Sequence, residues 1–305
     1  MSLLTVGTVA FDSIETPYGR AERVVGGACT YISWAASYFQ SDIHLVSIVG
    51  DDFPKEELTK LESRGVNLDG LEVVKGGKSF FWEGKYHQNM NSRDTITTEL
   101  NVLADFNPIL PEMAKSAKFV MLGNLTPAIQ AAVLDQLDGS QTLIALDTMN
   151  FWMDIALDEL LNVIKRIDIL IINDEEARQL SGEHSLVKAA HHIFDLGIQY
   201  LVIKKGEHGA LLFSKDDVFF APALPLAEVN DPTGAGDTFA GGFMGYLSRT
   251  KDISMEGMKR AIIAGSAMAS FCVEDFSLNK LKALDMPMIQ QRLRSFKNLI
   301  HFDLE

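Results

Sequence analysis

The sequence predicts an α/β protein with a doubly wound, mostly parallel β-sheet flanked by helices, together with a small β-sheet that acts as a lid. Short apolar runs typical of buried strands alternate with amphipathic helical stretches over the first two thirds of the chain. Such alternation indicates a parallel sheet with helices on both faces. From about Gly236 onward the periodicity becomes mainly helical.

Six apolar runs are the predicted strands of the main sheet, and helices are expected between them. The strands are LLTVGTV (3–9), IHLVSIV (43–49), KFVML (118–122), TLIAL (142–146), IDILII (167–172) and YLVIK (200–204). The helices are Tyr31–Phe39, Pro54–Arg64, Pro127–Leu137, Leu157–Ile167, Glu175–Leu180 and Leu186–Leu196.

Two segments interrupt this order, residues 12–24 and residues 71–104. In the second, FFWEGKYHQ and TITTEL alternate apolar and polar side chains, which is typical of a strand with one face in water. We therefore expect residues 1–11, 25–70 and 105–305 to form the α/β domain. Residues 12–24 and 71–104 are expected to form the lid over it.

The chain is acidic, with 41 Asp and Glu against 27 Lys and Arg and a formal net charge of -14. A surface of this charge repels polyphosphate backbones and anionic lipids, and no basic run offsets it. No apolar stretch is long enough to span a bilayer. We therefore expect neither a nucleic acid nor a membrane as a partner.

The two cysteines, Cys29 and Cys272, lie far apart and belong to no CxxC or Cys/His cluster. Neither a disulfide framework nor a zinc site is expected, and a cytoplasmic location fits this cysteine usage. The N-terminal apolar run has no charged segment before it and is interrupted by Gly7 and Asp12. We interpret it as a first strand rather than a signal peptide.

The segment DPTGAGDTFAGGF (231–243) carries the strongest functional pattern. The small residues Gly234, Ala235 and Gly236 let backbone N–H groups converge on an anion, and the helix that follows adds the positive end of its dipole. Asp237 can then serve as the base for an attacking hydroxyl, although the dipole should favour its charged form and make it a weak one. The alternative is a plain turn followed by a helix-capping residue.

This segment closely resembles the C-terminal signature of the ribokinase-like (PfkB) carbohydrate kinases. The resemblance implies ATP-dependent phosphorylation of a hydroxyl on a sugar or sugar-like molecule, with Mg²⁺. It also implies that Asp237 is the catalytic base and that Gly234, Ala235 and Gly236 form the anion hole. Two alternatives stay open: a nucleoside kinase of the same family, and a non-catalytic sugar-sensing protein that retains the fold.

For the acceptor, the resemblance implies a site near the N-terminus. Asp12 in VGTVAFD matches the aspartate that hydrogen-bonds substrate hydroxyls, and Gly26 and Gly27 match a pair of glycines beside the sugar. Tyr31 stands where many members carry a sugar-contacting Asn, so it can contact substrate or fill the core. Asn124, after the strand KFVML, is a further substrate candidate.

For the nucleotide, NDEEA resembles the family's NxxE element. It implies Asn173 near the phosphates and Glu176 near Mg²⁺ through water, although a helix cap with the same spacing explains both residues. VIKKGEHGALLF resembles a KxGxxG-type element along the nucleotide, with Lys205, Gly206 and Gly209 as the nearest matches.

Weaker resemblances complete the expected site. Asp147 in LDTMN matches part of a DxN pattern, Asp231 and Thr233 match positions that hold a monovalent cation in some relatives, and residues 261–276 match the helix beside adenine. In a nucleoside kinase, Tyr31 and the aromatic residues Phe80–Trp82 could stack on a base. A homodimer through the lid is also expected, because an accessory sheet exposes edges and apolar faces.

Overall fold

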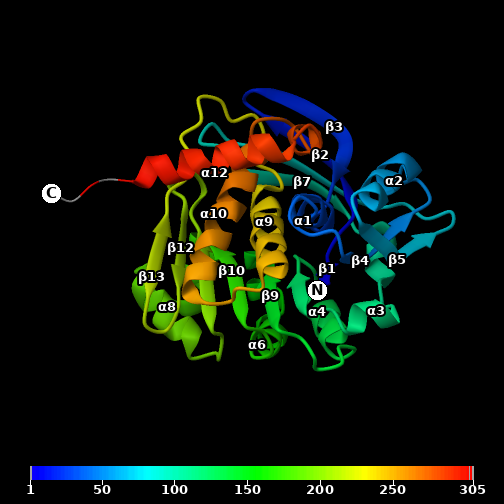
Figure 1. Cartoon of the computed structure of the whole chain (residues 1–305). Helices are drawn as coiled ribbons and strands as arrows, with labels where there is room; N and C mark the ends of the chain where they lie inside the picture. The colour runs from blue at the N-terminus through cyan, green and yellow to red at the C-terminus, as the bar shows by residue number, and fades with distance from the viewer. Residues whose placement is uncertain (1, 302, 304–305) are drawn as a thin grey trace.

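The computed structural model describes residues 2–301 and 303, and within them the chain forms two β-sheets (Figure 1). The main sheet is parallel from β11 to β5, and β12 and β13 extend it as an antiparallel edge. In spatial order its strands are β13 (Val218–Ala221), β12 (Ala210–Phe213), β11 (Tyr200–Lys204), β10 (Ile169–Asn173), β9 (Leu143–Asp147), β8 (Phe119–Leu122), β1 (Leu3–Val6), β4 (Ile43–Gly50) and β5 (Val66–Val74).

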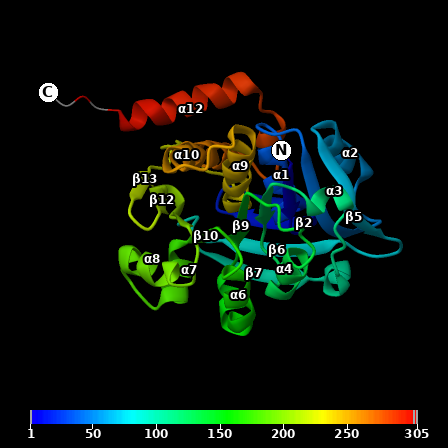
Figure 2. The same ribbon diagram turned by 60° about the horizontal axis from the view of Figure 1, so that its bottom comes forward.

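Helices cover both faces of this sheet, as Figure 2 shows with α9 and α10 above it and α4, α6 and α8 below. The first layer contains α1 (Ala28–Ala36), α2 (Lys55–Ser63), α9 (Ala235–Thr250), α10 (Met255–Cys272), α11 (Asn279–Lys282) and α12 (Met286–Ile300). The second contains α3 (Glu112–Lys115), α4 (Pro127–Leu134), α5 (Asn150–Ile155), α6 (Leu157–Ile164), α7 (Asp174–Ser181) and α8 (Leu186–Phe194). Short 3-10 helices are formed by η1 (Asn101–Asp105) and η2 (Gly206–His208). The predicted doubly wound fold is confirmed.

Strand alternation divides the core between these two layers. In β10, Ile169 and Ile171 pack with the α9 and α10 side, and Leu170 and Ile172 pack with the other side. All four are fully buried, which explains why the strand reads as a continuous apolar run. The predicted helix Tyr31–Phe39 begins three residues earlier, at Ala28, because the chain turns at Gly27 (φ 90°).

The small sheet has the order β3 (Gly19–Gly26), β2 (Ala10–Thr16), β6 (Phe80–Tyr86) and β7 (Arg93–Glu99). Its central pair, β2 and β6, is parallel, and the outer pairs are antiparallel. Residues 71–74, expected in the lid, instead continue β5 and pair with β4 in the main sheet. An edge strand with one exposed face has the same alternating pattern as a lid strand, so the sequence could not separate them.

The small sheet lies over the carboxyl edge of the main sheet. In Figure 1 β1 runs upward from the amino terminus, and β2, β3 and β7 lie at the top of the molecule. The hydroxyl of Thr233, in the loop before α9, donates to the hydroxyl of Tyr86 in β6 at 3.2 Å. The carboxyl edge is where open α/β sheets bind ligands, so the small sheet covers the expected site.

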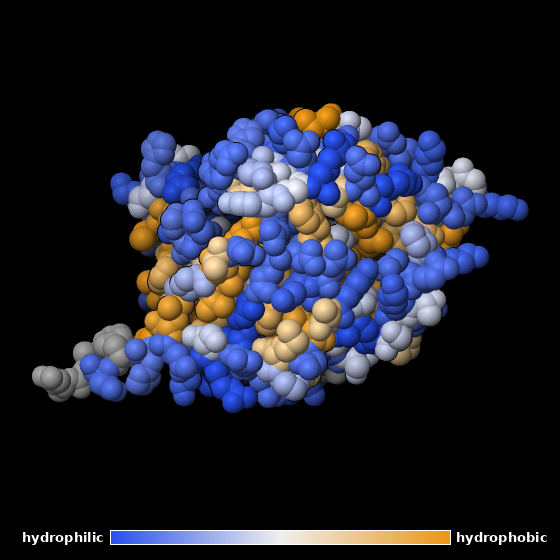
Figure 3. All heavy atoms as spheres, turned by 90° about the horizontal axis from the view of Figure 1, so that it is seen from above, coloured by the Kyte–Doolittle hydropathy of each residue, from blue (hydrophilic) through white to orange (hydrophobic). Residues whose placement is uncertain are grey.

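The surface around the small sheet is mostly hydrophilic, with hydrophobic side chains gathered in separate patches, as Figure 3 shows from above. On and beside the small sheet, Tyr18, Ile96 and Leu100 are 65%, 57% and 50% exposed. Such exposed apolar side chains are compatible with the expected homodimer, which stays a prediction. None of the described helices is long and apolar enough to cross a membrane.

Candidate active site

The loop before α9 has the geometry of an anion-binding helix N-terminus. Gly234 is the N-cap residue and adopts φ 74°, in the left-handed region that favours glycine. Ala235 and Gly236 begin the 16-residue helix, so the free backbone N–H groups of its first turn are gathered at this loop. The residues predicted as an anion hole therefore lie at the start of a long helix.

Asp237 lies in the first turn of α9 and is only partly exposed. Burial, with a smaller contribution from Asp147, raises its pKa from 3.8 to about 7, while Lys204 and Arg93 oppose the shift. The raised pKa makes Asp237 a stronger base than its place at a helix start led us to expect. A carboxylate with a pKa near 7 is well matched to accept a proton at neutral pH.

Asp12, in β2, is 5% exposed and faces the paired glycines. A Cβ atom on Gly26 would lie 1.9 Å from its Oδ2, and the backbone of Gly27 donates a hydrogen bond to it. Burial, together with the charges of Asp231 and Asp237, raises the pKa of Asp12 to about 7. The fold thus brings Asp12 and Asp237 into one electrostatic environment although 225 positions separate them.

Tyr31 fills the core beneath the anion loop. Its side chain is 1% exposed, and a Cβ atom on Gly234 would lie 2.5 Å from its Cε2 and Cζ atoms. Its hydroxyl has no hydrogen-bond partner among the described residues, and burial raises its pKa well above 10. This packing does not favour the substrate stacking suggested for Tyr31, and the ring instead supports Gly234.

Both polar groups of the Asn124 side chain have partners within the protein. Its Oδ1 accepts from Nε1 of Trp152 at 2.8 Å, and its Nδ2 lies 3.1 Å from Sδ of Met149. Each atom keeps one further hydrogen-bonding site, and substrate binding by Asn124 stays a prediction.

On the nucleotide side, Asn173 and Glu176 form a reciprocal cap at the start of α7. The Glu176 N–H donates to Oδ1 of Asn173 at 2.8 Å, and the Asn173 N–H donates to Oε2 of Glu176 at 2.7 Å. Burial raises the pKa of Glu176 to about 7; Lys204 opposes the shift and Asp147 adds to it. The capping alternative is thus present, and it leaves one carboxylate oxygen of Glu176 outside the cap.

The donor set suits a metal ion that is held mainly by a nucleotide. Among residues 2–301 and 303, no group of three or more His, Cys, Asp or Glu side chains could hold an ion directly. Mg²⁺ usually keeps several waters and binds one or two carboxylates together with substrate phosphates. Glu176 is buried at the carboxyl edge of the main sheet with one carboxylate oxygen outside the cap, and its water-mediated role near Mg²⁺ stays a prediction.

Lys204 is a site residue that the sequence analysis missed, because it named the neighbouring Lys205. The Nζ of Lys204 donates to Oδ2 of Asp147 at 2.8 Å, and it lies 3.1 Å from where a Cβ on Gly236 would stand. Burial alone would lower the pKa of Lys204, but Asp147 and Glu176 hold it above its ordinary value. The spacing of KxGxxG could have identified it, since Lys204 stands two residues before Gly206 and five before Gly209. Lys204 also shares a strand face with Val202, which packs toward α9.

Lys205 contributes through its backbone to the turn that follows β11. Its N–H donates to the carbonyl of Gly209 at 2.8 Å, and Gly206 and Gly209 adopt φ 54° and 87°. The tip of the small sheet reaches this turn, because Nδ2 of Asn91 donates to Oε1 of Glu207 at 3.4 Å. Nucleotide binding by this turn stays a prediction.

Arg93, in β7, is a second residue that the sequence analysis missed. Its positive charge lowers the pKa of both Asp237 and Glu176, although it lies far from them in sequence.

Asp231 is buried, and both of its carboxylate oxygens accept hydrogen bonds. Its Oδ1 accepts from the Thr233 N–H at 2.8 Å and its Oδ2 from the Ser277 N–H at 3.1 Å. A monovalent cation beside Asp231 and Thr233 stays a prediction.

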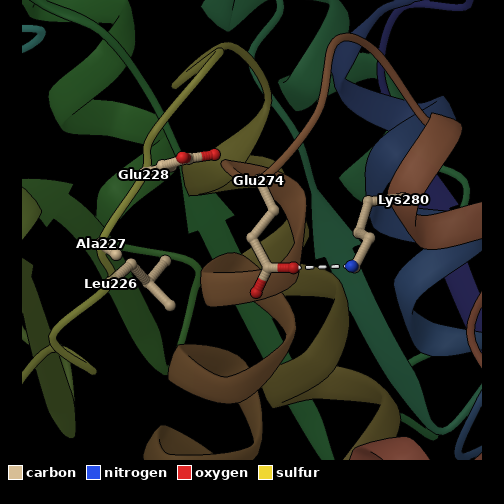
Figure 4. Close-up of a pocket in the computed structure, with 5 residues that line it drawn as sticks. All are labelled: Leu226, Ala227, Glu228, Glu274 and Lys280. Carbon is tan, nitrogen blue, oxygen red and sulfur yellow. Dashed lines mark ion pairs between the residues drawn. The ribbon is translucent and has the colours of Figure 1, made fainter.

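A separate cavity of about 360 Å³ lies beside the loop that leads to Asp231 (Figure 4). It is lined by Leu226, Ala227, Glu228, Glu274 and Lys280. The carboxylate of Glu274 points to Lys280 at 2.7 Å and also pairs with Arg292. None of the candidate catalytic residues lines this cavity, so it is not the site described above.

Comparisons with known proteins identify the relatives of this chain. Residues 2–282 match the model of the pfkB family carbohydrate kinases. The chain is 30% identical over 257 residues to the cytidine kinase of Thermococcus kodakarensis, covering 83% of this chain and 91% of that protein. It is 27% identical over 292 residues to the nucleoside kinase of Methanothermobacter thermautotrophicus, covering 90% and 89%. The solved nucleoside kinase of Methanocaldococcus jannaschii has the same fold, with a TM-score of 0.76, 20% identity and coverage of 96% and 98%.

Proposed function

Because this chain belongs to the pfkB family of carbohydrate kinases, which transfer phosphoryl groups to hydroxyl acceptors, we propose that it phosphorylates a nucleoside hydroxyl with ATP. Asp237 acts as the base and the backbone of residues 234–236 as the anion hole. The observation that carries this proposal is the position of Asp237, in the first turn of α9 directly after the left-handed Gly234. A carboxylate and a set of free N–H groups at one helix end are what phosphoryl transfer requires.

The chemical step can be assigned to residues of this chain. Asp12 accepts hydrogen bonds from acceptor hydroxyls and orients the one that reacts. Asp237 accepts the proton of that hydroxyl while its oxygen bonds to the γ-phosphorus. The bond from the γ-phosphorus to the β-phosphate oxygen breaks, and ADP leaves with the electron pair. Mg²⁺, when bound to the nucleotide with Glu176 nearby through water, supplies neutralisation of the phosphate charge.

Two observations favour a nucleoside over a free sugar as the acceptor. Trp82 pairs in register with Asp12, so both side chains project from the same face of the small sheet, the face from which Tyr86 contacts Thr233. The Trp82 ring lies close along Gly84, where a Cβ atom would be 2.1 Å from it, and it stays partly exposed. Its Nε1 donates to Oγ1 of Thr95 in β7 at 3.3 Å. A flat indole on the same sheet face as a hydroxyl-reading carboxylate suits a base attached to a ribose. The relatives named above as cytidine and nucleoside kinases support the same acceptor class.

Replacing Trp82 tests the acceptor class. We expect Trp82→Ala to raise KM for a nucleoside acceptor about tenfold, because stacking of a base on an aromatic ring contributes about 1–3 kcal/mol. KM for free ribose should change little, since ribose has no base to stack. Phe81→Leu, on the opposite face of β6, is the matched control and should leave both values near wild type. Equal losses for ribose and nucleoside would argue against base stacking on Trp82.

The carboxylates with raised pKa values predict an unusual pH dependence of stability. Asp12, Glu176 and Asp237 have ordinary values of 3.8 to 4.5 and folded values of about 7. At a pH between the unfolded and folded pKa values, these three carboxyl groups hold more protons in the folded protein than in the unfolded chain. The stabilisation of the fold that results is fully present at low pH and is lost as the pH rises to 7. The carboxylates with lowered pKa values, such as Glu57 and Glu274, change the pH dependence of stability only at a pH below this range.

We therefore expect the ligand-free protein to have a smaller free energy of unfolding at pH 8 than at pH 5, measured by urea denaturation. The double variant Asp12→Asn/Asp237→Asn removes two of the three groups and should flatten the pH dependence. A free energy of unfolding that rises between pH 5 and pH 8 would contradict the assignment of these raised values.

A further inference from the structure

The side-chain amide of Asn124 is held in one orientation at the carboxyl edge of the main sheet. Its Oδ1 accepts from Nε1 of Trp152 at 2.8 Å, and an indole nitrogen can only donate, so the carbonyl end of the amide must face Trp152. The amino end faces Sδ of Met149 at 3.1 Å, and a thioether is a weak acceptor. One N–H and one carbonyl lone pair therefore remain free, and their order along the amide is fixed.

The side chain that orients this amide is itself held in place. Trp152 lies in α5, and its ring packs against the core layer that contains α4 and α6. The same helix is tied to α7, because Nε2 of Gln179 donates to Oδ1 of Asp154 at 2.8 Å. A rotation of the amide by 180° would place its NH₂ group against the indole N–H and leave two donors without an acceptor. The rigid indole therefore opposes that rotation.

Asn124 lies on the acceptor side of the site, beside the paired glycines. It follows β8, which pairs with β1, the strand that leads into β2 and Asp12. A Cβ atom on the preceding Gly123 would lie 3.5 Å from Cβ of Ala28, the residue after Gly27. Because Gly27 donates a hydrogen bond to Asp12, Asn124 stands next to the segment that holds the acceptor carboxylate. Its side chain is partly exposed there.

We propose that Asn124 reads the base of the acceptor, and that Trp152 is the positioning residue that fixes the order of donor and acceptor with which it does so. This rests on the proposed function, since it assumes a nucleoside acceptor. An amide offers a donor beside an acceptor, and it pairs with a base edge that presents the complementary order. Cytosine and adenine present an amino donor beside a ring-nitrogen acceptor, whereas uracil and hypoxanthine present a carbonyl acceptor beside an N–H donor. A fixed amide matches one of these two classes and leaves unpaired groups against the other.

A purely structural role does not account for an asparagine at this position. A buried indole N–H needs one acceptor, and a carboxylate or a backbone carbonyl would satisfy it equally well. The amide of Asn124 adds an NH₂ group, whose partner Met149 offers only a sulfur. A donor with a weak partner at the edge of a ligand site is available to a base.

The experiment measures kcat/KM with MgATP for two matched pairs of acceptors, cytidine against uridine and adenosine against inosine. We expect the wild-type protein to favour one member of at least one pair by about 10–100-fold, the discrimination of a bidentate hydrogen-bonded pair. Asn124→Asp keeps an acceptor for the indole but has no donor, so it matches neither class and the ratio should fall close to unity. Trp152→Phe leaves the amide free to rotate and should lower the ratio about tenfold, while KM for free ribose stays near wild type.

Trp34→Phe is the matched control, because the indole N–H of Trp34 is buried and has no hydrogen-bond partner among the described residues. It should leave every ratio at its wild-type value. Since Asn124→Asp keeps the bond to the indole, it tests the proposal even if Trp152→Phe does not fold. Wild-type ratios near unity in both pairs, or ratios unchanged in Asn124→Asp, overturn base reading by Asn124 and leave nucleoside phosphorylation standing. If no nucleoside is phosphorylated, the proposed acceptor is overturned as well.

Discussion

Asp237→Asn is expected to lower kcat for phosphoryl transfer by about 10²–10⁴-fold while nucleotide affinity stays near wild type. The substitution keeps the shape of the side chain but removes the group that accepts the hydroxyl proton. Burial and Asp147 hold the pKa of Asp237 near 7, so at neutral pH the base has both a useful ionised fraction and enough basicity. The measurement is steady-state ADP release with Mg²⁺, ATP and a panel of nucleosides, accompanied by ATP binding.

Asp285→Asn is a suitable control for this substitution. Asp285 is also an acidic residue at a helix start, where its Oδ1 accepts from the Met288 N–H at 2.8 Å, and asparagine is an equally good N-cap. The control should retain wild-type turnover and stability. Turnover by Asp237→Asn within a few-fold of wild type would remove Asp237 from the mechanism.

Gly234→Ala is expected to lower kcat by about 10²–10³-fold, because it displaces the loop that forms the anion hole. Two effects act together. A left-handed backbone costs a non-glycine residue about 1–2 kcal/mol, and the new Cβ would meet the Tyr31 ring at 2.5 Å. Since Tyr31 is fully buried, the loop has to move instead of the ring. A lower melting temperature should accompany the loss of activity.

Backbone strain and the clash with Tyr31 can be separated with a second glycine. Gly139 has φ 78°, close to that of Gly234, but a Cβ atom there has no heavy atom within 4 Å. Gly139→Ala should therefore lower stability slightly and leave kcat unchanged. If both variants lost stability equally and both kept wild-type kcat, the contact between Gly234 and Tyr31 would have no part in holding the anion loop.

The structure changes most the prediction of which aromatic residue contacts the acceptor. The sequence suggested Tyr31 as an aromatic contact for a nucleoside, but the ring lies beneath Gly234 and is 1% exposed. Trp82, one of the lid aromatics considered from sequence, shares a sheet face with Asp12 instead. A nucleoside acceptor thus rests on Trp82 and on the relatives, and no longer on Tyr31.

Much of the protein was predictable from local patterns. The order of strands and helices could be predicted from apolar periodicity. Each central strand is buried on both faces, one face in each layer of the core, so it appears in the sequence as an unbroken apolar run. The segment 231–243 carries its own backbone geometry, since a left-handed glycine followed by small residues at a helix start is a local feature. The same holds for the cap formed by Asn173 and Glu176, three residues apart. Such features depend on neighbours in sequence, so the sequence alone was sufficient for them.

Other features required the tertiary structure because they depend on contacts between distant segments. Which of two adjacent lysines meets Asp147 is set by the face of β11 that packs toward α9, and Lys204 is the one. Residues 71–74 join the main sheet because β4 offers a free edge, which no local pattern reveals. Asp237 is a stronger base than its helix position implies, because burial and the charge of Asp147 raise its pKa. Burial, strand pairing and charge at the candidate site are set by packing between distant segments, so the sequence alone could not determine them.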